Sequence, residues 1–202
     1  MSNNKNANSI QIARKYLDSL VVEGRILGAV HPSSKVTVLG KEFETPIMTA
    51  ALSHLKPGLA GYVEGAKLAG ALASVGMCEE PEMEQVLATG ASVIEIIKPY
   101  ADKEAILSRI RFAEENGAFG VGMDVEHSVN SDDDEDSMVG PFAMKLPTLD
   151  ELKAYVASTK LPFFFKGALS VQDALTAKEI GAAGIILSHH NSLMKWAIPP
   201  YA

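Results

Sequence analysis

Two short apolar segments near the C-terminal end of the sequence constrain the fold more than any other feature. The apolar run 163–165 leads directly into Lys166, and the run 185–187 is soon followed by His190. Continuous apolar runs of this length are typical of strands buried on both faces of a parallel sheet. The intervening residues 170–180 fit one crossover helix. The pattern therefore predicts a lysine and a histidine at the C-terminal ends of adjacent strands, where the chemistry of β/α barrels is found.

The upstream sequence repeats this alternation of strand and helix. The predicted strands are 46–51, 74–77, 92–97, 119–124, 163–165 and 185–187, and the predicted helices are 59–73, 80–88, 103–116, 148–158 and 170–180. Regular alternation predicts a parallel sheet with right-handed crossovers.

These segments give six β/α units, whereas a closed barrel needs eight strands. We therefore predict a (β/α)8 TIM-barrel type of fold of which the first six units are present, as a fragment of a longer barrel. The rival is a complete open α/β fold of six strands. An open edge beside an apolar strand argues against that rival, since proteins usually protect such edges.

The residues before the first unit predict two smaller elements. Ser9 is a candidate N-cap for a helix whose apolar residues recur at helical spacing, so one face of this helix is expected to pack. A hairpin within residues 36–43 is expected to plug the N-terminal end of the barrel. We interpret residues 1–202 as one domain, with a disordered lead at 1–8 and a mobile acidic loop at 125–146.

Composition narrows the class of protein. The 202 residues are 47% hydrophobic and carry a formal net charge of −7, so the chain suits a globular domain without a basic surface for nucleic acid. Cys78 is the single cysteine, which is typical of a reducing compartment. The polar N-terminus lacks the apolar core of a signal peptide, and no apolar run approaches the ~20 residues of a membrane span. We expect a soluble cytoplasmic protein.

Three motifs carry a family resemblance. The sequence reads LPFFFKGA at 161–168, SVQDA at 170–174 and GAAGIILSHH at 181–190. In this order and spacing they resemble the FMN-dependent α-hydroxy-acid oxidase and dehydrogenase family (glycolate oxidase, lactate oxidase and relatives). The resemblance extends over about residues 25–202. It implies FMN as cofactor and the oxidation of a small 2-hydroxy acid by hydride transfer to the flavin.

The resemblance also implies roles for three side chains. Lys166 aligns with the lysine that contacts the flavin and stabilises negative charge on the reduced ring. His190 aligns with the general base that takes the hydroxyl proton. Asp124 aligns with the aspartate that pairs with this histidine. The alternatives are a lysine that extends its charged end to solvent at a strand end, an ordinary loop histidine, and an aspartate that caps local amides.

Further flavin contacts follow from the same alignment. The first-strand turn brings small residues to the ring, and single positions on the second, third and sixth strands lie near it. The expected cofactor-binding residues, besides Lys166, are Thr49, Ala50, Ala51, Gly76, Met77, Glu95 and Ser188.

The sequence departs from the family where the substrate carboxylate is bound. Leu193 replaces the family arginine, and Lys195 lacks the planar pair of donors that an arginine offers. The loop after Asp124 contains no second arginine. This leaves open another FMN barrel enzyme, such as one like type 2 isopentenyl diphosphate isomerase, and a truncated product without catalysis. Tetramers are common in the family, so the resemblance leaves a homo-oligomer open.

No metal site is predicted. The acidic run 131–137 lacks the order of ligands found in EF-hand loops, and we interpret it as a solvated loop tip. His31, His54 and His127 show no metal-ligand spacing in the sequence.

Overall fold

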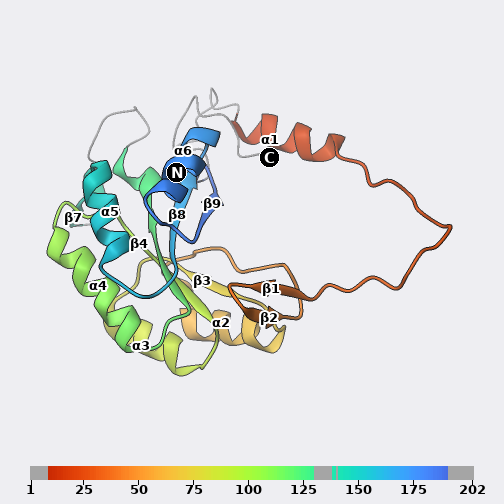
Figure 1. The fold of residues 1–202 in the computed structure, drawn as a ribbon. Helices are drawn as coiled ribbons and strands as arrows, with labels where there is room; N and C mark the ends of the chain where they lie inside the picture. Colours follow the sequence, from red (N-terminus) through yellow and green to blue (C-terminus); the bar gives the residue numbers. More distant parts are fainter. Residues whose placement is uncertain (1–8, 130–137, 140, 191–202) are drawn as a thin grey trace.

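Five parallel strands form the central sheet of the computed structural model, which describes residues 9–129, 138–139 and 141–190 (Figure 1). The strands are β3 (Ala73–Val75), β4 (Val93–Ile97), β5 (Gly120–Asp124), β8 (Phe163–Ala168) and β9 (Gly184–Leu187). They lie side by side in chain order, and every neighbouring pair is parallel. This arrangement is that of a partial β/α barrel, and it confirms the predicted fold class.

A helix follows or precedes each strand at nearly the predicted positions. The helices are α2 (Leu59–Leu68), α3 (Glu80–Ala88), α4 (Lys103–Glu115), α5 (Leu149–Ala157) and α6 (Val171–Glu179). Local caps fix several helix starts: Asp102 accepts hydrogen bonds from backbone N–H groups of α4, and Thr148 and Ser170 form capping boxes. Helix α2 ends earlier than predicted, because Gly70 adopts a left-handed φ of +66°.

Alternation along each strand divides the core into two layers. On β4, Val93 and Ile97 pack with residues of the surrounding helices. Ile94 and Ile96 point the other way, into the barrel interior, and pack with Phe164 of β8. The interior side chains are therefore every second residue of each strand. Continuing this alternation to the C-terminal end of a strand places further side chains at the mouth of the barrel.

The predicted hairpin closes the opposite end of the interior. It consists of β1 (Val36–Val38) and β2 (Lys41–Phe43), which pair antiparallel. Phe43 is buried and packs edge-on against Phe119, just before β5, with ring centroids 5.9 Å apart. The hairpin thus covers the N-terminal ends of the strands, as predicted.

The first predicted strand, 46–51, does not form a ladder. Isolated parallel bridges join Met48 to Leu72 and Leu52 to Val75. Between them the backbone N–H of Thr49 donates to the carbonyl of Leu72 at 3.2 Å. The hydroxyl of Thr49 accepts from the N–H of Ser74 at 2.7 Å and donates to the carbonyl of Ser74 at 3.1 Å. The segment occupies the place of a first strand beside β3, but the prediction of a regular strand was wrong.

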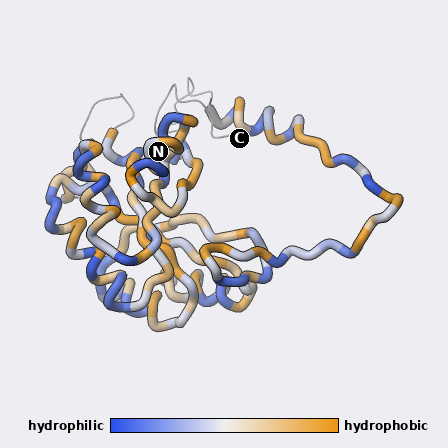
Figure 2. The backbone as a smooth tube through the Cα atoms, viewed as in Figure 1, coloured by the Kyte–Doolittle hydropathy of each residue, from blue (hydrophilic) through white to orange (hydrophobic). Residues whose placement is uncertain are grey.

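Helix α1 (Ser9–Ser19) also differs from its prediction. It was expected to pack, yet Leu17 is 59% exposed, and the helix lies apart from the barrel beyond an extended segment (Figures 1 and 2). Residues 1–8 and the acidic run 131–137 lie outside the described residues. The described part of 125–146 contains η1 (Val125–Ser128) and the short hairpin of β6 (Met138–Val139) and β7 (Phe142–Ala143).

The hairpin β6–β7 is joined to the loop after β4. Ala101 donates a backbone hydrogen bond to Ala143, and the rings of Tyr100 and Phe142 lie 5.5 Å apart.

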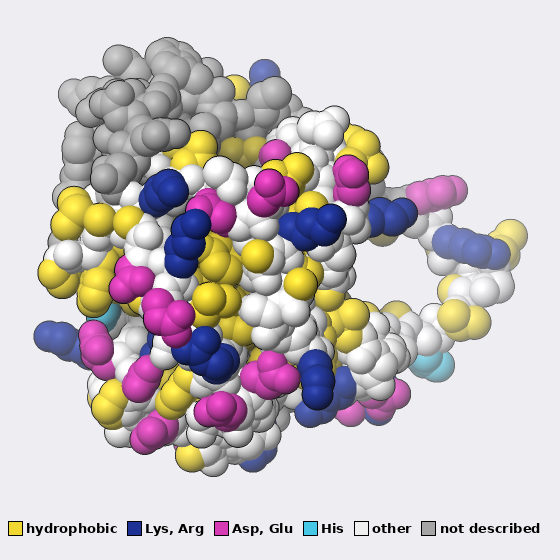
Figure 3. Space-filling view, turned by 60° about the vertical axis from the view of Figure 1, so that its left-hand side comes forward, with side chains coloured by type: hydrophobic (Ala, Val, Ile, Leu, Met, Phe, Trp, Pro, Cys, Tyr) yellow, Lys and Arg dark blue, Asp and Glu magenta, His cyan; other side chains and the backbone are white. Residues whose placement is uncertain are grey.

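On the face drawn in Figure 3, acidic and basic side chains are interspersed. No helix among the described residues is both long and apolar enough to cross a membrane.

The close approach of β5 to β8 gives a test of the interior packing. A methyl group at Gly122 would lie 2.7 Å from the carbonyl oxygen of Phe164 and 2.8 Å from Cδ1 of Ile96. We expect Gly122→Ala to lower the free energy of unfolding by about 1–3 kcal/mol in urea denaturation. The control, Gly65→Ala on exposed helix α2, has no atom within 4 Å of the new methyl group and should raise stability by up to about 1 kcal/mol. Equal effects of the two variants would contradict this packing.

Candidate active site

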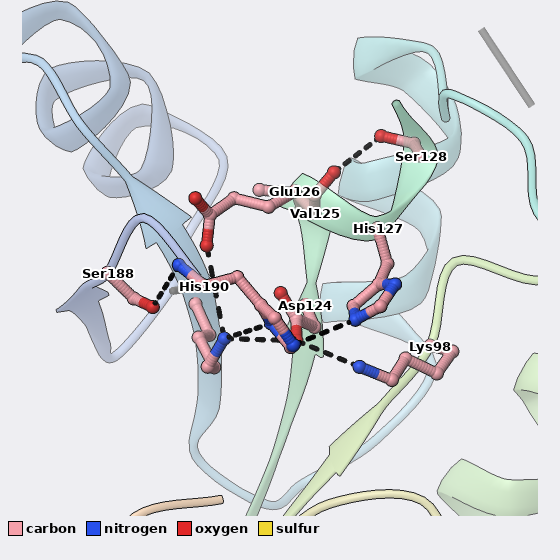
Figure 4. Close-up of polar contacts among 9 residues, drawn as sticks. Lys98, Asp124, Val125, Glu126, His127, Ser128, Ser188 and His190 are labelled. Carbon is pink, nitrogen blue, oxygen red and sulfur yellow. Dashed lines mark hydrogen bonds and ion pairs between the residues drawn. The ribbon is translucent and has the colours of Figure 1, made fainter. Parts of the chain in front are cut away.

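Three neighbouring strand ends bring two lysines and one aspartate together. Asp124 is the last residue of β5, Lys166 lies in β8 on one side of it, and Lys98 follows β4 on the other side. The Nζ atoms of both lysines lie 3.0 Å from Oδ2 of Asp124 (Figure 4). All three residues are buried. One carboxylate oxygen therefore accepts hydrogen bonds from two buried ammonium groups.

His190, just after β9, completes this cluster. Its Nδ1 lies 2.9 Å from Oδ2 of Asp124 and 3.0 Å from Nζ of Lys166. The backbone of His190 has a left-handed φ of +39°, and its N–H donates to Oγ of Ser188 at 3.1 Å. A left-handed conformation costs a non-glycine residue roughly 1–2 kcal/mol, so the surrounding contacts hold the ring in place.

The negative charge of Asp124 attracts the positively charged groups of this cluster. Burial alone would raise the pKa of Asp124, but the hydrogen bond to His190 and the charges of Lys98 and Lys166 hold that pKa well below its usual range. Its second oxygen, Oδ1, is buried without a hydrogen-bond partner in the described part of the chain. Asp124 is therefore an anion at neutral pH, and it orients the three groups around it.

Two residues of η1 approach the cluster in neutral form. Burial raises the pKa of Glu126 to about 8, although Lys166 lies 3.9 Å from its Oε2 and opposes this shift. Burial lowers the pKa of His127 to about 4, and the charge of Lys98 acts in the same direction. The Nε2 atoms of His127 and His190 are 3.0 Å apart. One proton between these nitrogens is enough to make this hydrogen bond.

Glycine at position 167 permits the approach of Glu126. Gly167 has a φ of +101°, and a side chain there would collide with Cγ of Glu126. The register of β8 with β9 shifts between Lys166 and Ala168. This irregularity ends the regular ladder beside Lys166, at the mouth of the barrel.

The first-strand segment forms a neighbouring wall. The N–H of Gly76 donates to the carbonyl of Leu52 at 2.8 Å, and the carbonyl of Ala51 would lie 3.0 Å from a methyl group at Gly76. The carbonyl of Ala50 accepts from the hydroxyl of Tyr62 at 3.1 Å. Thr49 uses its hydroxyl on β3, as described above. These predicted cofactor-binding residues thus lie together beside β3, and all of them have small side chains.

Two predicted cofactor contacts are placed elsewhere. Glu95 has the parity of the helix-facing residues, and its carboxylate pairs with Arg109 of α4, whose Nε lies 2.9 Å from Oε1. Met77 lines a separate cavity of about 340 Å³ together with Tyr100 and Arg109. The alignment assigned Glu95 to the flavin side of the strand. In this structure the alternation of side chains along β4 directs Glu95 to the helix layer instead, and its flavin contact stays a prediction.

Lys98, Glu126 and His127 also belong to this cluster, although the sequence did not predict them there. Lys98 follows a buried apolar run, as Lys166 does, and this shared pattern was a usable signal. Glu126 and His127 carry no comparable signal, because the turn of η1 decides where they point. His127 was set aside for want of metal-ligand spacing, yet the fold places it against His190.

Candidate ligand atoms of Asp124, His127 and His190 lie within 4.8 Å of one another, a separation that would suit a metal ion. The two lysine ammonium groups already contact the same carboxylate oxygen, and their positive charges oppose a divalent cation. The sequence analysis predicted no metal, and that statement stays a prediction.

Comparison with known proteins places this cluster in a family. The sequence pattern of the family described as FMN-dependent dehydrogenase matches residues 1–146 and 126–192. The chain belongs to this FMN-dependent dehydrogenase family. The predicted resemblance is thereby confirmed.

Individual relatives agree with the family. Glycolate oxidase 3 of Arabidopsis thaliana is 24% identical over 77% of this chain and 53% of its own length. L-lactate oxidase of Alicycliphilus denitrificans is 46% identical, over 22% of this chain and 12% of its own length. The chain therefore spans about half the length of the plant relative.

Solved structures support the fold. A structure of mandelate oxidase with 3,3-difluoro-2-hydroxy-3-phenylpropionic acid has a TM-score of 0.80 at 21% identity, over 97% of this chain and 63% of the other. A mandelate oxidase variant with a monooxide FMN adduct gives 0.80 at 22% identity, over 98% and 64%.

The buried Glu126 gives a pH-dependent prediction. Its pKa is about 8 in the folded chain against 4.5 for an ordinary glutamate, so between these values the folded chain retains a proton that the unfolded chain releases. The stability that Glu126 contributes is thus fully present below pH 4.5 and is lost as the pH rises through about 8. In urea unfolding, we expect the free energy of unfolding of Glu126→Gln, relative to that of the native chain, to increase from pH 4.5 to about pH 8. Above pH 8 this difference should stay constant.

His127 titrates in both the native chain and Glu126→Gln, so its contribution cancels when the free energies of unfolding of the two chains are subtracted. A stability difference that stays constant from pH 4.5 to pH 8 would contradict the raised pKa of Glu126.

The pairing of Glu95 gives a second prediction. Glu95→Gln leaves the guanidinium of Arg109, 14% exposed, without a charged partner. We expect the variant to lower the free energy of unfolding by up to about 3 kcal/mol and to leave FMN affinity unchanged. The control, Glu104→Gln, removes the exposed partner of Arg111 on the same helix and should change stability by less than about 1 kcal/mol. Loss of FMN affinity specific to Glu95→Gln would restore the predicted flavin contact.

Proposed function

We propose that this chain forms the catalytic centre of an FMN-dependent oxidoreductase that oxidises a small 2-hydroxy acid. The observation that carries the proposal is His190, held by Nδ1 on the buried anion Asp124 at 2.9 Å with the ammonium of Lys166 beside both. The relatives of known activity, glycolate oxidase, L-lactate oxidase and mandelate oxidase, are all named for 2-hydroxy acids.

His190 is arranged to act as a base. When its Nδ1–H donates to Asp124, the other nitrogen, Nε2, presents a lone pair. This atom would accept the hydroxyl proton of the substrate, and the negative charge of Asp124 would stabilise the imidazolium that forms. Nε2 of His127 lies 3.0 Å from this nitrogen, so the substrate hydroxyl would take the place of His127 as its hydrogen-bonding partner.

Lys166 and the first-strand segment suit a flavin. FMN, when bound, supplies the acceptor for the hydride that leaves the substrate carbon. A buried lysine at the end of β8 would stabilise negative charge on its reduced ring. The small residues Thr49, Ala50 and Ala51 beside Gly76 permit close approach of a planar ring to the backbone. Ser188 lies next to His190 at the same mouth, where its hydroxyl accepts the N–H of His190.

The partner, the location and the assembly follow from the same proposal. The partner is a small-molecule substrate, with no nucleic acid. A cytoplasmic location fits Cys78, which is free and buried. A homo-oligomer is compatible with the family.

The flavin spectrum tests the proposal. The full chain is incubated with FMN and desalted, and its visible absorption is recorded before and after anaerobic addition of glycolate, lactate or mandelate. We expect the native chain to retain flavin and one of these acids to bleach it. His190→Gln should retain flavin but slow the bleaching by about 10²–10⁴-fold, the usual contribution of a general base. Lys166→Met should lose flavin affinity.

Lys153→Met, a change at an exposed position of α5, serves as the matched control and should behave like the native chain. A native chain that is colourless after desalting would overturn the activity of this chain. Unchanged bleaching in His190→Gln would overturn the role of the histidine.

A further inference from the structure

The ammonium group of Lys98 is a buried charge that the chemistry proposed above does not use. Its side chain is 8% exposed, and Nζ lies 3.0 Å from Oδ2 of Asp124. In the part of the chain that the structure describes, Asp124 is its single hydrogen-bond partner. An ammonium group has three N–H donors, so two of them are left for another acceptor. Leaving buried donors unpaired is costly, which favours binding of a ligand there.

The charge of the cluster points to an anion. Asp124 contributes one negative charge and the two lysines two positive charges, whereas Glu126 and His127 are neutral at pH 7. Burial lowers the pKa of Lys98, and the attraction of Asp124 only partly opposes this. A second anion beside Lys98 would therefore stabilise its charged form and complete the charge balance.

The position of Lys98 separates it from the proposed flavin lysine. Lys98 reaches Asp124 from β4, and Lys166 reaches it from β8, the strand on the opposite side of β5. Nζ of Lys166 also lies 3.0 Å from Nδ1 of His190, whereas the hydrogen bond of Lys98 is to Asp124 (Figure 4). Both the base and the unused ammonium group are thus anchored on one carboxylate oxygen.

We propose that Lys98 binds the carboxylate of the substrate, a small 2-hydroxy acid, while His190 receives its hydroxyl. This inference rests on the proposed function. The two functional groups of a 2-hydroxy acid are on adjacent carbons, and the two protein groups meet at Asp124. Lys98 thereby supplies the cation that the missing arginines would otherwise provide. Because an ammonium group is a point charge, it fixes the orientation of the acid less firmly than a guanidinium group does.

Comparing the binding of a charged ligand with that of a neutral ligand tests the inference without measuring catalysis. Glycolate and its neutral counterpart, glycolamide, are titrated into the full chain without FMN, at matched ionic strength, while the imidazole resonances of His190 are followed by NMR. We expect the native chain to bind glycolate about 10- to 100-fold more tightly than glycolamide, as one charge-assisted hydrogen bond implies. In Lys98→Met the two ligands should bind with equal affinity. Lys153→Met should keep the native preference.

Each remaining outcome bears on the inference. A native chain that binds glycolate no better than glycolamide, or shows no saturable binding of glycolate with or without FMN, overturns it. This comparison in the native chain decides the matter even if Lys98→Met fails to fold, which circular dichroism would reveal. A Lys98→Met chain that folds and keeps the native preference also overturns it.

Flavin retention, measured in parallel, separates this inference from the proposed function. Loss of flavin affinity in Lys98→Met with unchanged glycolate preference would make Lys98 a flavin residue and overturn the inference, leaving the proposed function standing. A colourless native chain whose preference for glycolate depends on Lys98 would keep the carboxylate site and overturn the flavin chemistry.

Discussion

The hydrogen bonds to one oxygen of Asp124 determine how the mouth of this barrel is organised. Lys98, Lys166 and His190 come from three different parts of the chain, and all contact Oδ2 within 3.0 Å. Each lysine is buried, and an isolated buried ammonium group would cost several kcal/mol. The carboxylate offsets this cost only because it is itself buried and ionised. Loss of its charge would leave two buried cations repelling each other.

The parallel sheet makes this convergence possible. Strands β4, β5 and β8 are hydrogen-bonded neighbours in register, so their C-terminal ends meet at one edge. Within β5 the interior positions before Asp124 are glycines 120 and 122, and they leave room for Phe164. The hairpin with Phe43 seals the other end. Apolar packing therefore occupies the lower interior, and charged groups gather at the mouth.

The residues of η1 complete the electrostatic environment of this mouth. Glu126 lies 3.9 Å from Lys166 and would neutralise it if ionised, but burial raises its pKa to about 8. His127 stays neutral for the same reason, since burial disfavours the charged form of either group. The cluster keeps an excess of positive charge at neutral pH. A reduced flavin and the carboxylate of the proposed substrate are both anions, so this excess of positive charge would suit both proposed ligands.

Much of the architecture followed from local sequence patterns. Apolar runs separated by helical segments determined the strands and their order, and capping residues such as Thr148 and Ser170 determined where helices begin. The positions of Lys166 and His190 after apolar runs predicted that they would share one mouth, because parallel strands end at a common edge, and the family resemblance added Asp124. The first strand was predicted less well: isolated backbone bridges join it to its neighbour, and Thr49 contacts Ser74 through its hydroxyl rather than through its backbone.

Tertiary structure decided which side chains face the mouth. Glu95 and Lys98 are three residues apart on and just after one strand, yet strand parity directs the first to Arg109 and the second to Asp124. The local sequence signals only part of this difference: Lys98 ends an apolar run, as Lys166 does, whereas Glu95 lies within one. His127 and Glu126 reach the cluster through the turn of η1 and the left-handed Gly167. Sequence alone determined which residues stand at the ends of the strands, whereas register and turns, which depend on contacts between distant segments, determined which of them meet.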